Sequence, residues 1–272
     1  MSFTEHLRTS WTSSQSMLCV GLDPDHERIP AALGSGPDAV FDFCREIVDA
    51  TADVVCAFKP QFAHFAARRA EPQLERLCAY IRETYPDVVL ILDAKRGDIG
   101  STAEHYATEA FARYDAHAVT VNPYLGTDAV APFLAHAGRG VIVLCRTSNA
   151  GSGDFQSLVV DGQPLYVHVA RRVATEWSRL GECGIVVGAT YPDELRTVRG
   201  TVGDLPILVP GIGAQGGDVS ATVTAGLDST AKGMIVNSSR AVLYASAGAD
   251  FADAARRVAI TTRDEIRASA AP

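Results

Sequence analysis

The amino-acid sequence predicts an α/β fold, a single (β/α)8 TIM barrel. Apolar strand-like segments alternate with longer helix-like segments along most of the chain, and there are eight of each. A doubly wound open sheet usually needs fewer strands than a barrel does. The length of 272 residues, 47% of them hydrophobic, suits one barrel or two smaller domains. We therefore expect residues 1–272 to form one barrel domain.

The predicted strands are short apolar runs bounded by turn residues. The run VVLIL at 88–92 shows the pattern most clearly, because an uninterrupted apolar run is typical of a strand that is covered on both faces. The strands are expected at 17–23, 54–59, 88–95, 118–122, 140–146, 184–188, 207–210 and 232–237. Helix-like stretches separate them at 38–50, 62–84, 101–114, 127–136, 164–179, 192–201, 217–225 and 249–269.

Composition and missing motifs narrow the class of protein. A net charge of -8 argues against a broad nucleic-acid surface, although a small basic pocket for an anion remains possible. No apolar run reaches membrane-spanning length, and the first residues lack the layout of a signal peptide, so we expect a cytoplasmic protein with no membrane partner. The six scattered cysteines, seven histidines without ligand spacing and the lack of a GxSxG elbow demand no metal, flavin or pyridoxal cofactor.

Charged residues gather where the third predicted strand ends. Asp93 and Lys95 follow the apolar run at i and i+2, so an extended backbone would point both side chains the same way. Ionised groups that enter a core are costly unless they pair, which places this acid and base in one network. Asp98 follows, and Ser101 with Glu104 predicts a capping box for the next helix. A purely structural ion pair and a helix-start carboxylate are the alternative interpretation.

Two further charges end the first and second strands. Asp23 follows one apolar run and Lys59 follows the next, and the carboxyl ends of barrel strands converge on one mouth. Acid and base from three strands would then alternate around that mouth. Asp23, which precedes Pro24, could equally serve only to form a turn.

Two loops add polar groups to the same mouth. The segment 147–163 is too long for a mere connector, so it is either a flap over the mouth or a disordered surface loop, and Ser148 at its base could bond a ligand's polar edge. The loop at 209–218 is rich in glycine, with Gly211, Gly213 and Gly216 able to expose backbone N–H groups to a phosphate. Arg240, after the eighth strand, falls beside that loop in a barrel, unless it is only a solvated helix-start residue.

Several motifs in one order resemble the orotidine 5'-phosphate decarboxylase family, specifically its longer bacterial subgroup, type 2. The resemblance extends over nearly the whole chain through VGLDPD, FKPQ, DAKRGDIGSTA, LCRTSN, VGATYPDEL, PGIGAQGGD and NSSRA. It implies decarboxylation of orotidine 5'-monophosphate (OMP) to uridine 5'-monophosphate (UMP), the last step of de novo pyrimidine synthesis, without a cofactor. It also implies a homodimer whose active sites lie at the interface.

The resemblance assigns the catalytic roles position by position. Lys59, Asp93 and Lys95 match the family's charged array, and Asp98 matches an aspartate contributed across the dimer interface. Lys95 is expected to stabilise and protonate a carbanion at C6 of the pyrimidine, because no cofactor is present to act as an electron sink. Asp93 would lie close to the departing carboxylate, while Lys59 and Asp98 hold Lys95 protonated and oriented.

Substrate-binding roles follow in the same way. Asp23 matches a ribose contact, and Ser148 matches the residue that reads the pyrimidine edge. The remaining matches are Ile99 and Thr102, supplied by the partner, and Gln215 with Arg240, which grip the phosphate. One departure concerns the segment after the serine, where the family commonly has Asn-Pro-Gly and this chain has Asn149, Ala150 and Gly151.

Three rival functions remain open from the residues alone. A magnesium-dependent decarboxylase or aldolase of sugar phosphates in the same superfamily would share the Asp-x-Lys-x-x-Asp strand end. A Schiff-base enzyme would use Lys59 or Lys95 as its nucleophile. A catalytically silent nucleotide-binding barrel would bind 6-substituted UMP without turnover.

Overall fold

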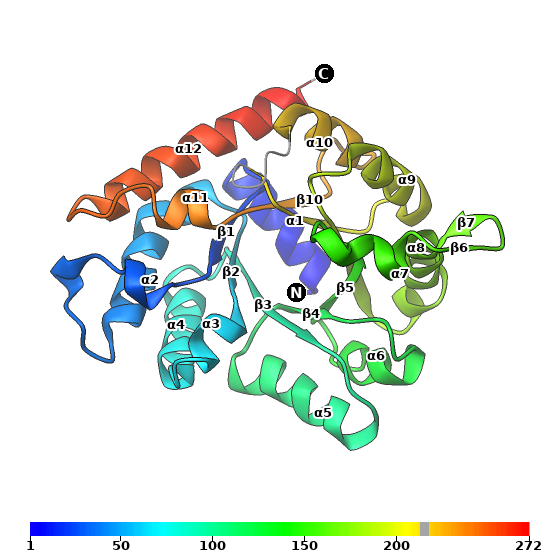
Figure 1. The fold of residues 1–272 in the computed structure, drawn as a ribbon, viewed down its shortest axis with the longest axis horizontal. Helices are drawn as coiled ribbons and strands as arrows, with labels where there is room; N and C mark the ends of the chain where they lie inside the picture. Colours follow the sequence, from blue (N-terminus) through cyan, green and yellow to red (C-terminus); the bar gives the residue numbers. More distant parts are fainter. Residues whose placement is uncertain (213–217, 272) are drawn as a thin grey trace.

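The computed structural model describes residues 1–212 and 218–271, which form a closed barrel of eight parallel strands surrounded by helices (Figure 1). The predicted (β/α)8 fold is confirmed. Neighbouring strands follow the order β1-β10-β9-β8-β5-β4-β3-β2. The strands are β1 Leu18–Leu22, β2 Ala57–Pro60, β3 Val89–Arg96, β4 Ala118–Val121, β5 Gly140–Arg146, β8 Glu182–Val187, β9 Ile207–Pro210 and β10 Met234–Ser238.

Helices cover the outside of the barrel, and two of the predicted ones differ from expectation. Predicted helix 62–84 is divided in two, because Arg69 has a left-handed φ of 55° and Pro72 starts the second half. Predicted helix 101–114 continues from α5 as a π-helix, Glu109–Arg113. The outer helices are α2 Ala39–Thr51, α3 Phe62–Ala66, α4 Glu71–Thr84, α5 Gly100–Thr108, α6 Thr127–Leu134, α8 Leu165–Thr175, α9 Pro192–Val202, α10 Val219–Gly226, α11 Arg240–Leu243 and α12 Phe251–Ala270.

Sequence reasoning missed the first helix, α1 Phe3–Ser13, which crosses the end of the barrel in Figure 1. Ser2 and Glu5 form a reciprocal capping box at its start, a signal that was available in the sequence. The Ser10 hydroxyl donates to the carbonyl of Cys56, just before β2, and the Phe3 ring fills the space that a side chain at Gly140 would need. The helix therefore closes the barrel at the amino ends of its strands.

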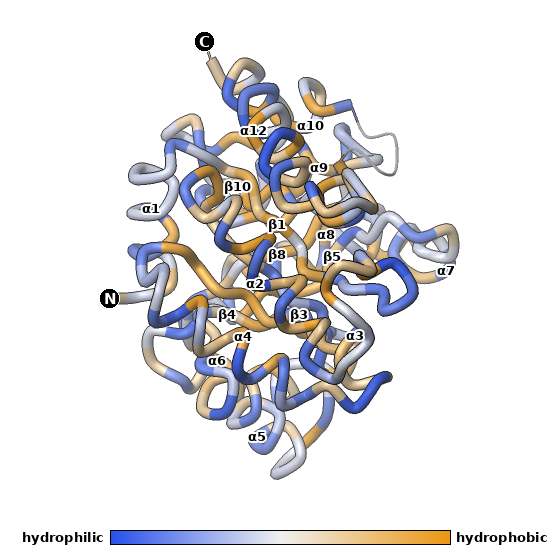
Figure 2. The backbone as a smooth tube through the Cα atoms, turned by 90° about the vertical axis from the view of Figure 1, so that its left-hand side faces the viewer, coloured by the Kyte–Doolittle hydropathy of each residue, from blue (hydrophilic) through white to orange (hydrophobic). Residues whose placement is uncertain are grey.

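The core is continuous through the strands, where hydrophobic residues concentrate in Figure 2. All five residues of β1 are buried, as is expected for a parallel strand with side chains packed on both faces. All six cysteines are buried and unpaired. Among the described residues, no helix is both long and apolar enough to cross a membrane.

Near the mouth, the expected capping box is wrong and one alternative for the segment 147–163 is ruled out. The helix after β3 begins at Gly100 and has Ile99 as its N-cap without a side-chain cap bond, so Ser101 and Glu104 form no capping box. Of the two alternatives for the segment 147–163, the disordered surface loop is wrong, because the segment contains the helix α7 Gly153–Gln156, while the flap over the mouth stays a prediction. A two-stranded hairpin of β6 Val159–Val160 and β7 Gln163–Pro164 follows that helix.

Candidate active site

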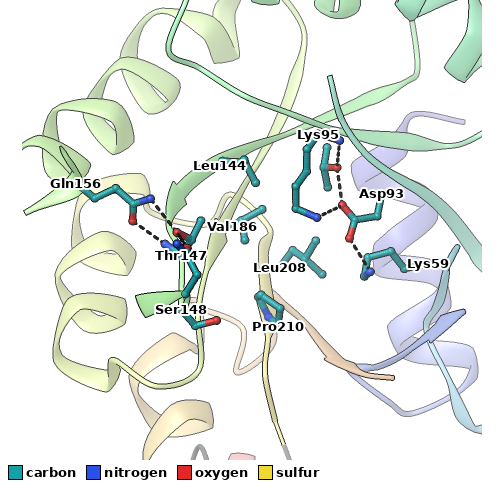
Figure 3. A pocket seen from close by; sticks show the side chains of 12 residues that line it. Lys59, Asp93, Lys95, Leu144, Thr147, Ser148, Gln156, Val186, Leu208 and Pro210 are labelled. Atoms are coloured by element: carbon teal, nitrogen blue, oxygen red, sulfur yellow. Dashed lines mark hydrogen bonds and ion pairs between the residues drawn. The ribbon is translucent and has the colours of Figure 1, made fainter. Parts of the chain in front are cut away.

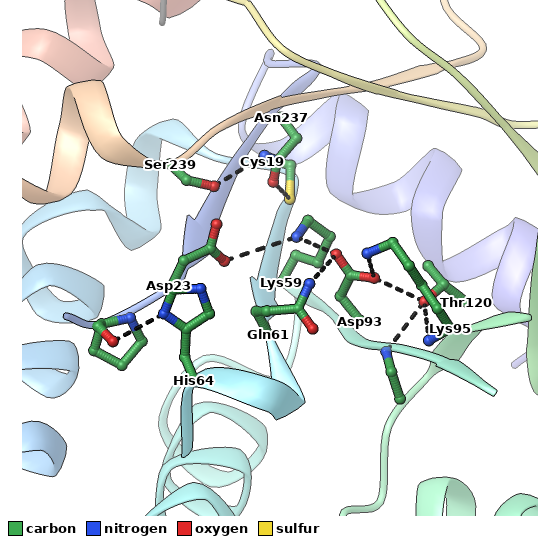
Figure 4. Close-up of polar contacts among 12 residues, drawn as sticks. Cys19, Asp23, Lys59, Gln61, His64, Asp93, Lys95, Thr120, Asn237 and Ser239 are labelled. Atoms are coloured by element: carbon green, nitrogen blue, oxygen red, sulfur yellow. Dashed lines mark hydrogen bonds and ion pairs between the residues drawn. The ribbon is translucent and has the colours of Figure 1, made fainter. Parts of the chain in front are cut away.

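The site is built around the carboxylate of Asp93, which receives hydrogen bonds from four side chains (Figure 4). Lys59 Nζ lies 2.8 Å from Oδ2, and Gln61 Nε2 lies 3.1 Å from the same oxygen. Lys95 Nζ lies 2.7 Å from Oδ1, and Thr120 Oγ1 lies 2.8 Å from it. Strands β2, β3 and β4 thus bring their donors to one acid.

Charge pairing keeps this buried cluster ionised. Burial opposes the ionised form of Asp93, but the charges of Lys59 and Lys95 outweigh it and hold the pKa of the carboxyl well below its usual range. Burial likewise disfavours the charged form of Lys59, but Asp93 and then Asp23 raise its pKa well above the usual range. Asp23 Oδ1 lies 3.9 Å from Lys59 Nζ, so the predicted alternation of acid and base at the mouth is confirmed for these four residues.

The two lysines differ in their access to the cavity. The side chain of Lys59 is 4% exposed, whereas that of Lys95 is 47% exposed. Both line a cavity of about 390 Å³ at the mouth (Figure 3), so Lys95 is the cation that a bound molecule can reach most directly. The other lining residues are Asp93, Thr120, Leu144, Thr147, Ser148, Asn149, Gln156, Val186, Leu208 and Pro210.

Ser148 lies across this cavity from the charged cluster (Figure 3). A Cβ atom on Gly188, which follows β8, would lie 2.7 Å from Ser148 Cβ, so only glycine allows this approach. Asn149 has φ −70° and ψ 154°, and Ala150 starts a 3-10 turn. That is the backbone a proline after Asn149 would require, so alanine in the Asn-Ala-Gly segment leaves the geometry in place.

A smaller cavity of about 160 Å³ adjoins the first and shares Lys59, Asp93 and Pro210 with it. Arg240, at the start of α11, and Gly211, with a φ of 102°, both line it. Asp23, Ile212, Asn237 and Ser239 complete its lining. The predicted phosphate residues Gly213, Gln215 and Gly216 lie outside the described residues.

Three predicted site residues do not line either cavity. Ile99 is 57% exposed, and Thr102 is exposed on α5. The carboxylate of Asp98 accepts the backbone N–H of Ile99 at 2.8 Å and forms no ion pair with any of the described residues. Within its own chain, this trio therefore forms no part of the walls of the two cavities.

Sequence reasoning missed three supporting residues. Gln61 and Thr120 contact Asp93 directly, and the motif FKPQ was the available signal for the first of them. Arg146, at the end of β5, is buried, donates to Ser152 Oγ at 2.8 Å and stacks over the ring of Tyr191 at 4.0 Å. It links the segment after β5 to the segment before α9.

A metal ion needs several donor side chains that lie close together. Within residues 1–212 and 218–271, no three His, Cys, Asp or Glu side chains come together in a way that could hold a metal ion. The acids at the mouth have lysines as their charged partners instead.

A closed parallel barrel with two lysines and two acids paired at the carboxyl ends of its strands defines the class of (β/α)8-barrel enzymes. The chain belongs to the orotidine 5'-phosphate decarboxylase / HUMPS family, whose model matches residues 16–257.

Relatives and solved structures agree with this assignment. A Ralstonia pickettii protein named orotidine 5'-phosphate decarboxylase is 63% identical over 266 residues, which cover 98% of each chain. A Bordetella pertussis protein of the same name is 61% identical over 270 residues, covering 98% of this chain and 99% of its own. The structure of Leishmania donovani OMP decarboxylase superimposes with a TM-score of 0.86 at 37% identity and covers 99% of both chains.

Proposed function

We infer that this protein is a carboxy-lyase that converts OMP to UMP and carbon dioxide, in the pathway that builds pyrimidine nucleotides. The observation that carries the inference is Lys95, whose half-exposed ammonium group bonds the buried carboxylate of Asp93 at the wall of a nucleotide-sized cavity. Family membership and relatives above 60% identity with this enzyme name support it. The same comparisons do not favour the sugar-phosphate or silent-barrel alternatives.

We propose an orientation of the substrate along the two joined cavities. The phosphate binds beside Gly211 and Arg240, where a backbone turn and a guanidinium suit an anion. The ribose lies against Asp23, and the pyrimidine edge meets Ser148. This places C6 and its carboxylate next to Lys95 and Asp93, at the junction of the cavities.

The proposed chemistry uses the ammonium group of Lys95 twice, first as a positive charge and then as a proton donor. The bond from C6 to the carboxylate breaks, the electron pair stays on C6 and carbon dioxide leaves. The ammonium group of Lys95 stabilises the developing charge, and its proton then forms the new C6–H bond. The neutral amine left behind regains a proton from water. Lys59, which is buried and forms an ion pair with Asp93, keeps the carboxylate of Asp93 ionised and in place during the reaction.

We further propose that the enzyme is a homodimer with shared sites. Asp98, Ile99 and Thr102 form no part of the cavity walls of their own chain and are available to a second copy. Tyr124 and Leu125, after β4, add exposed apolar surface to the same side of the barrel as Ile99. The rest of the proposal is a single barrel domain, a cytoplasmic location and no nucleic-acid partner.

Subunit mixing tests the shared site. Inactive Lys95→Ala and Asp98→Ala chains are combined under conditions in which subunit exchange has been proven by a labelled chain. Recovered turnover is expected, because one of the mixed dimer's two sites then holds both native residues. Absence of recovery despite exchange would mean that each chain completes its own site.

The reaction itself is tested by the ultraviolet absorbance of OMP after the purified protein is added in the presence of a chelator. We expect rapid conversion to UMP by the parent and none by Lys95→Ala. Conversion that requires added magnesium would favour the metal-dependent alternative, and borohydride trapping of a substrate adduct would favour the Schiff-base enzyme. Tight binding of 6-substituted UMP without turnover would identify a silent barrel.

A further inference from the structure

The backbone of Lys95 lies in an unusual conformation. Its φ is +47°, in the left-handed region that side-chain-bearing residues rarely adopt, although it lies within strand β3. The pairing between β3 and β4 shifts register between Leu92 and Arg96, so the regular ladder of hydrogen bonds is interrupted there. Such a conformation persists only where the surroundings hold it in place.

One hydroxyl supplies bonds at this irregular stretch. Thr120 Oγ1, on β4, accepts the backbone N–H groups of Ala94 at 3.1 Å and Lys95 at 3.0 Å. The same oxygen lies 2.8 Å from Asp93 Oδ1, which in turn accepts Lys95 Nζ at 2.7 Å (Figure 4). With both acceptor positions of the hydroxyl occupied by N–H groups, its proton is left for the carboxylate.

The hydroxyl is also well fixed in space. Thr120 is 1% exposed, and its β-branched side chain has few rotamers available in a strand. The hydroxyl therefore contacts two parts of Lys95. It bonds the main-chain N–H directly, and it is linked to the ammonium group through the carboxylate of Asp93, to which both donate.

We propose that Thr120 is a positioning residue, whose hydroxyl holds the left-handed backbone at Lys95 and the carboxylate of Asp93 in the one arrangement that places Lys95 Nζ for catalysis. This inference rests on the proposed function, in which Lys95 delivers the proton to C6. Thr120 acts through Asp93 and Lys95 and transfers no proton to the substrate.

The test compares Thr120→Val, which keeps the shape and removes the hydroxyl, with Thr120→Ser, which keeps the hydroxyl. Thr51→Val is the matched control, because Thr51 is fully buried and its hydroxyl donates only to Ile47 O at 2.7 Å, on α2 and away from the mouth. The measurements are kcat and KM for OMP, the affinity for UMP and the melting temperature. Thr120→Cys provides a second variant of similar size with a weaker hydrogen-bonding group, for use if the valine variant does not fold.

We expect kcat of Thr120→Val to fall roughly tenfold to hundredfold, as for other small displacements of a catalytic group. KM and UMP affinity should change by no more than about twofold, because Thr120 is only 1% exposed at the cavity wall and valine keeps its shape. Thr120→Ser should recover most of the loss, and Thr51→Val should lower only the melting temperature. A kcat of Thr120→Val equal to that of Thr51→Val would overturn the proposal, and so would a loss confined to KM.

Failure of the proposed function is recognised separately, because the parent would then convert no OMP at all. Crystal structures of the parent and Thr120→Val decide the inference in either case. Relaxation of Lys95 to a negative φ with displacement of Nζ from Asp93 supports the positioning role. An unchanged Lys95 conformation without the hydroxyl overturns it.

Discussion

The two ends of this barrel each bury a cation, and they satisfy it with different groups. At the mouth, Lys59 lies between the carboxylates of Asp93 and Asp23, and its pKa is raised although burial opposes the charge. At the closed end, Arg199 on α9 is also buried, but its hydrogen bonds within the described part of the chain go to neutral carbonyls. These belong to Gly203, Leu205, Gly226 and Gly233.

The difference separates function from stability. Burial lowers the pKa of Arg199 to about 10, with only partial relief from Asp228 and Asp204. The carbonyls nevertheless satisfy its donors and tie α9 to the two connections that lead into β9 and β10, at the amino ends of the strands. The mouth instead pairs two lysines with two acids, and its Lys95 has a left-handed backbone and a side chain that is half exposed to the cavity. A polar network that only stabilises is closed, whereas one that reacts keeps a charged group open to a ligand.

The largest loss of activity is expected when the half-exposed charge of Lys95 is removed. Lys95→Ala should lower kcat/KM by more than about a thousandfold, because it removes both the proton donor and the charge nearest to C6. The melting temperature should stay close to the parent's, since Asp93 keeps Lys59, Gln61 and Thr120 as partners. Activity measured alongside thermal unfolding checks both expectations, and near-normal turnover would remove Lys95 from its role.

A smaller loss of activity is expected at the phosphate end of the mouth. Arg240→Ala should lower kcat/KM by roughly a hundredfold without loss of stability, because Arg240 is exposed and its fork suits a phosphate. Arg257→Ala, at an exposed arginine of α12, is the control and should leave turnover unchanged. If the two variants had the same catalytic constants, the phosphate assignment would be wrong.

The closed end should show the reverse pattern. Arg199→Ala should lower the free energy of unfolding by about 3 kcal/mol or more, since several buried carbonyls lose their donor. The kcat of the folded fraction should stay that of the parent. Arg196→Ala, on the same helix but exposed and in a surface ion pair with Asp193, should cost less than about 1 kcal/mol. A fall in kcat for folded Arg199→Ala would contradict the assignment of the closed end to stability alone.

As pH falls, stability should be lost first through His117 at the closed end and only later through Asp93 at the mouth. Burial lowers the pKa of His117 to about 2, so the folded protein excludes a proton that the unfolded chain binds from about pH 6.5 downward. Stability from this neutral histidine is thus full above that pH and is lost as pH falls toward the folded value. Asp93, whose pKa is depressed by the lysines, adds its own loss only below about pH 4.

Urea unfolding of the parent and of His117→Asn, between about pH 6.5 and about pH 4, measures how the free energy of unfolding depends on pH. The variant should be less stable near neutral pH, since His117 Nδ1 accepts the N–H of Leu90, but its stability should depend less on pH. His105→Asn, at an exposed histidine of α5, should retain the parent's slope. Parallel slopes for the parent and His117→Asn would show that His117 is not the group responsible.

Much of the fold could be predicted because its signals are local. Apolar runs and the helices between them mark all eight barrel strands, and β5 and β9 begin and end at the predicted residues. The helix α1 was not predicted although its capping box is visible, because it precedes β1 and so lies outside the alternation of strand and helix that defines the barrel. The break between α3 and α4 depends on a left-handed Arg69, which no residue type requires there.

The sequence by itself determined which charges stand at the ends of which strands, because burial periodicity and strand ends are encoded over a few residues. Only the tertiary structure decided that Gln61 and Thr120 join Lys59 and Lys95 on one carboxylate. Those contacts span 27 to 34 residues of chain between the other strands and Asp93, so they depend on register and barrel closure. The left-handed backbone at Lys95 was likewise decided by the tertiary structure, because a neighbouring strand holds it and lysine as a residue type does not favour it.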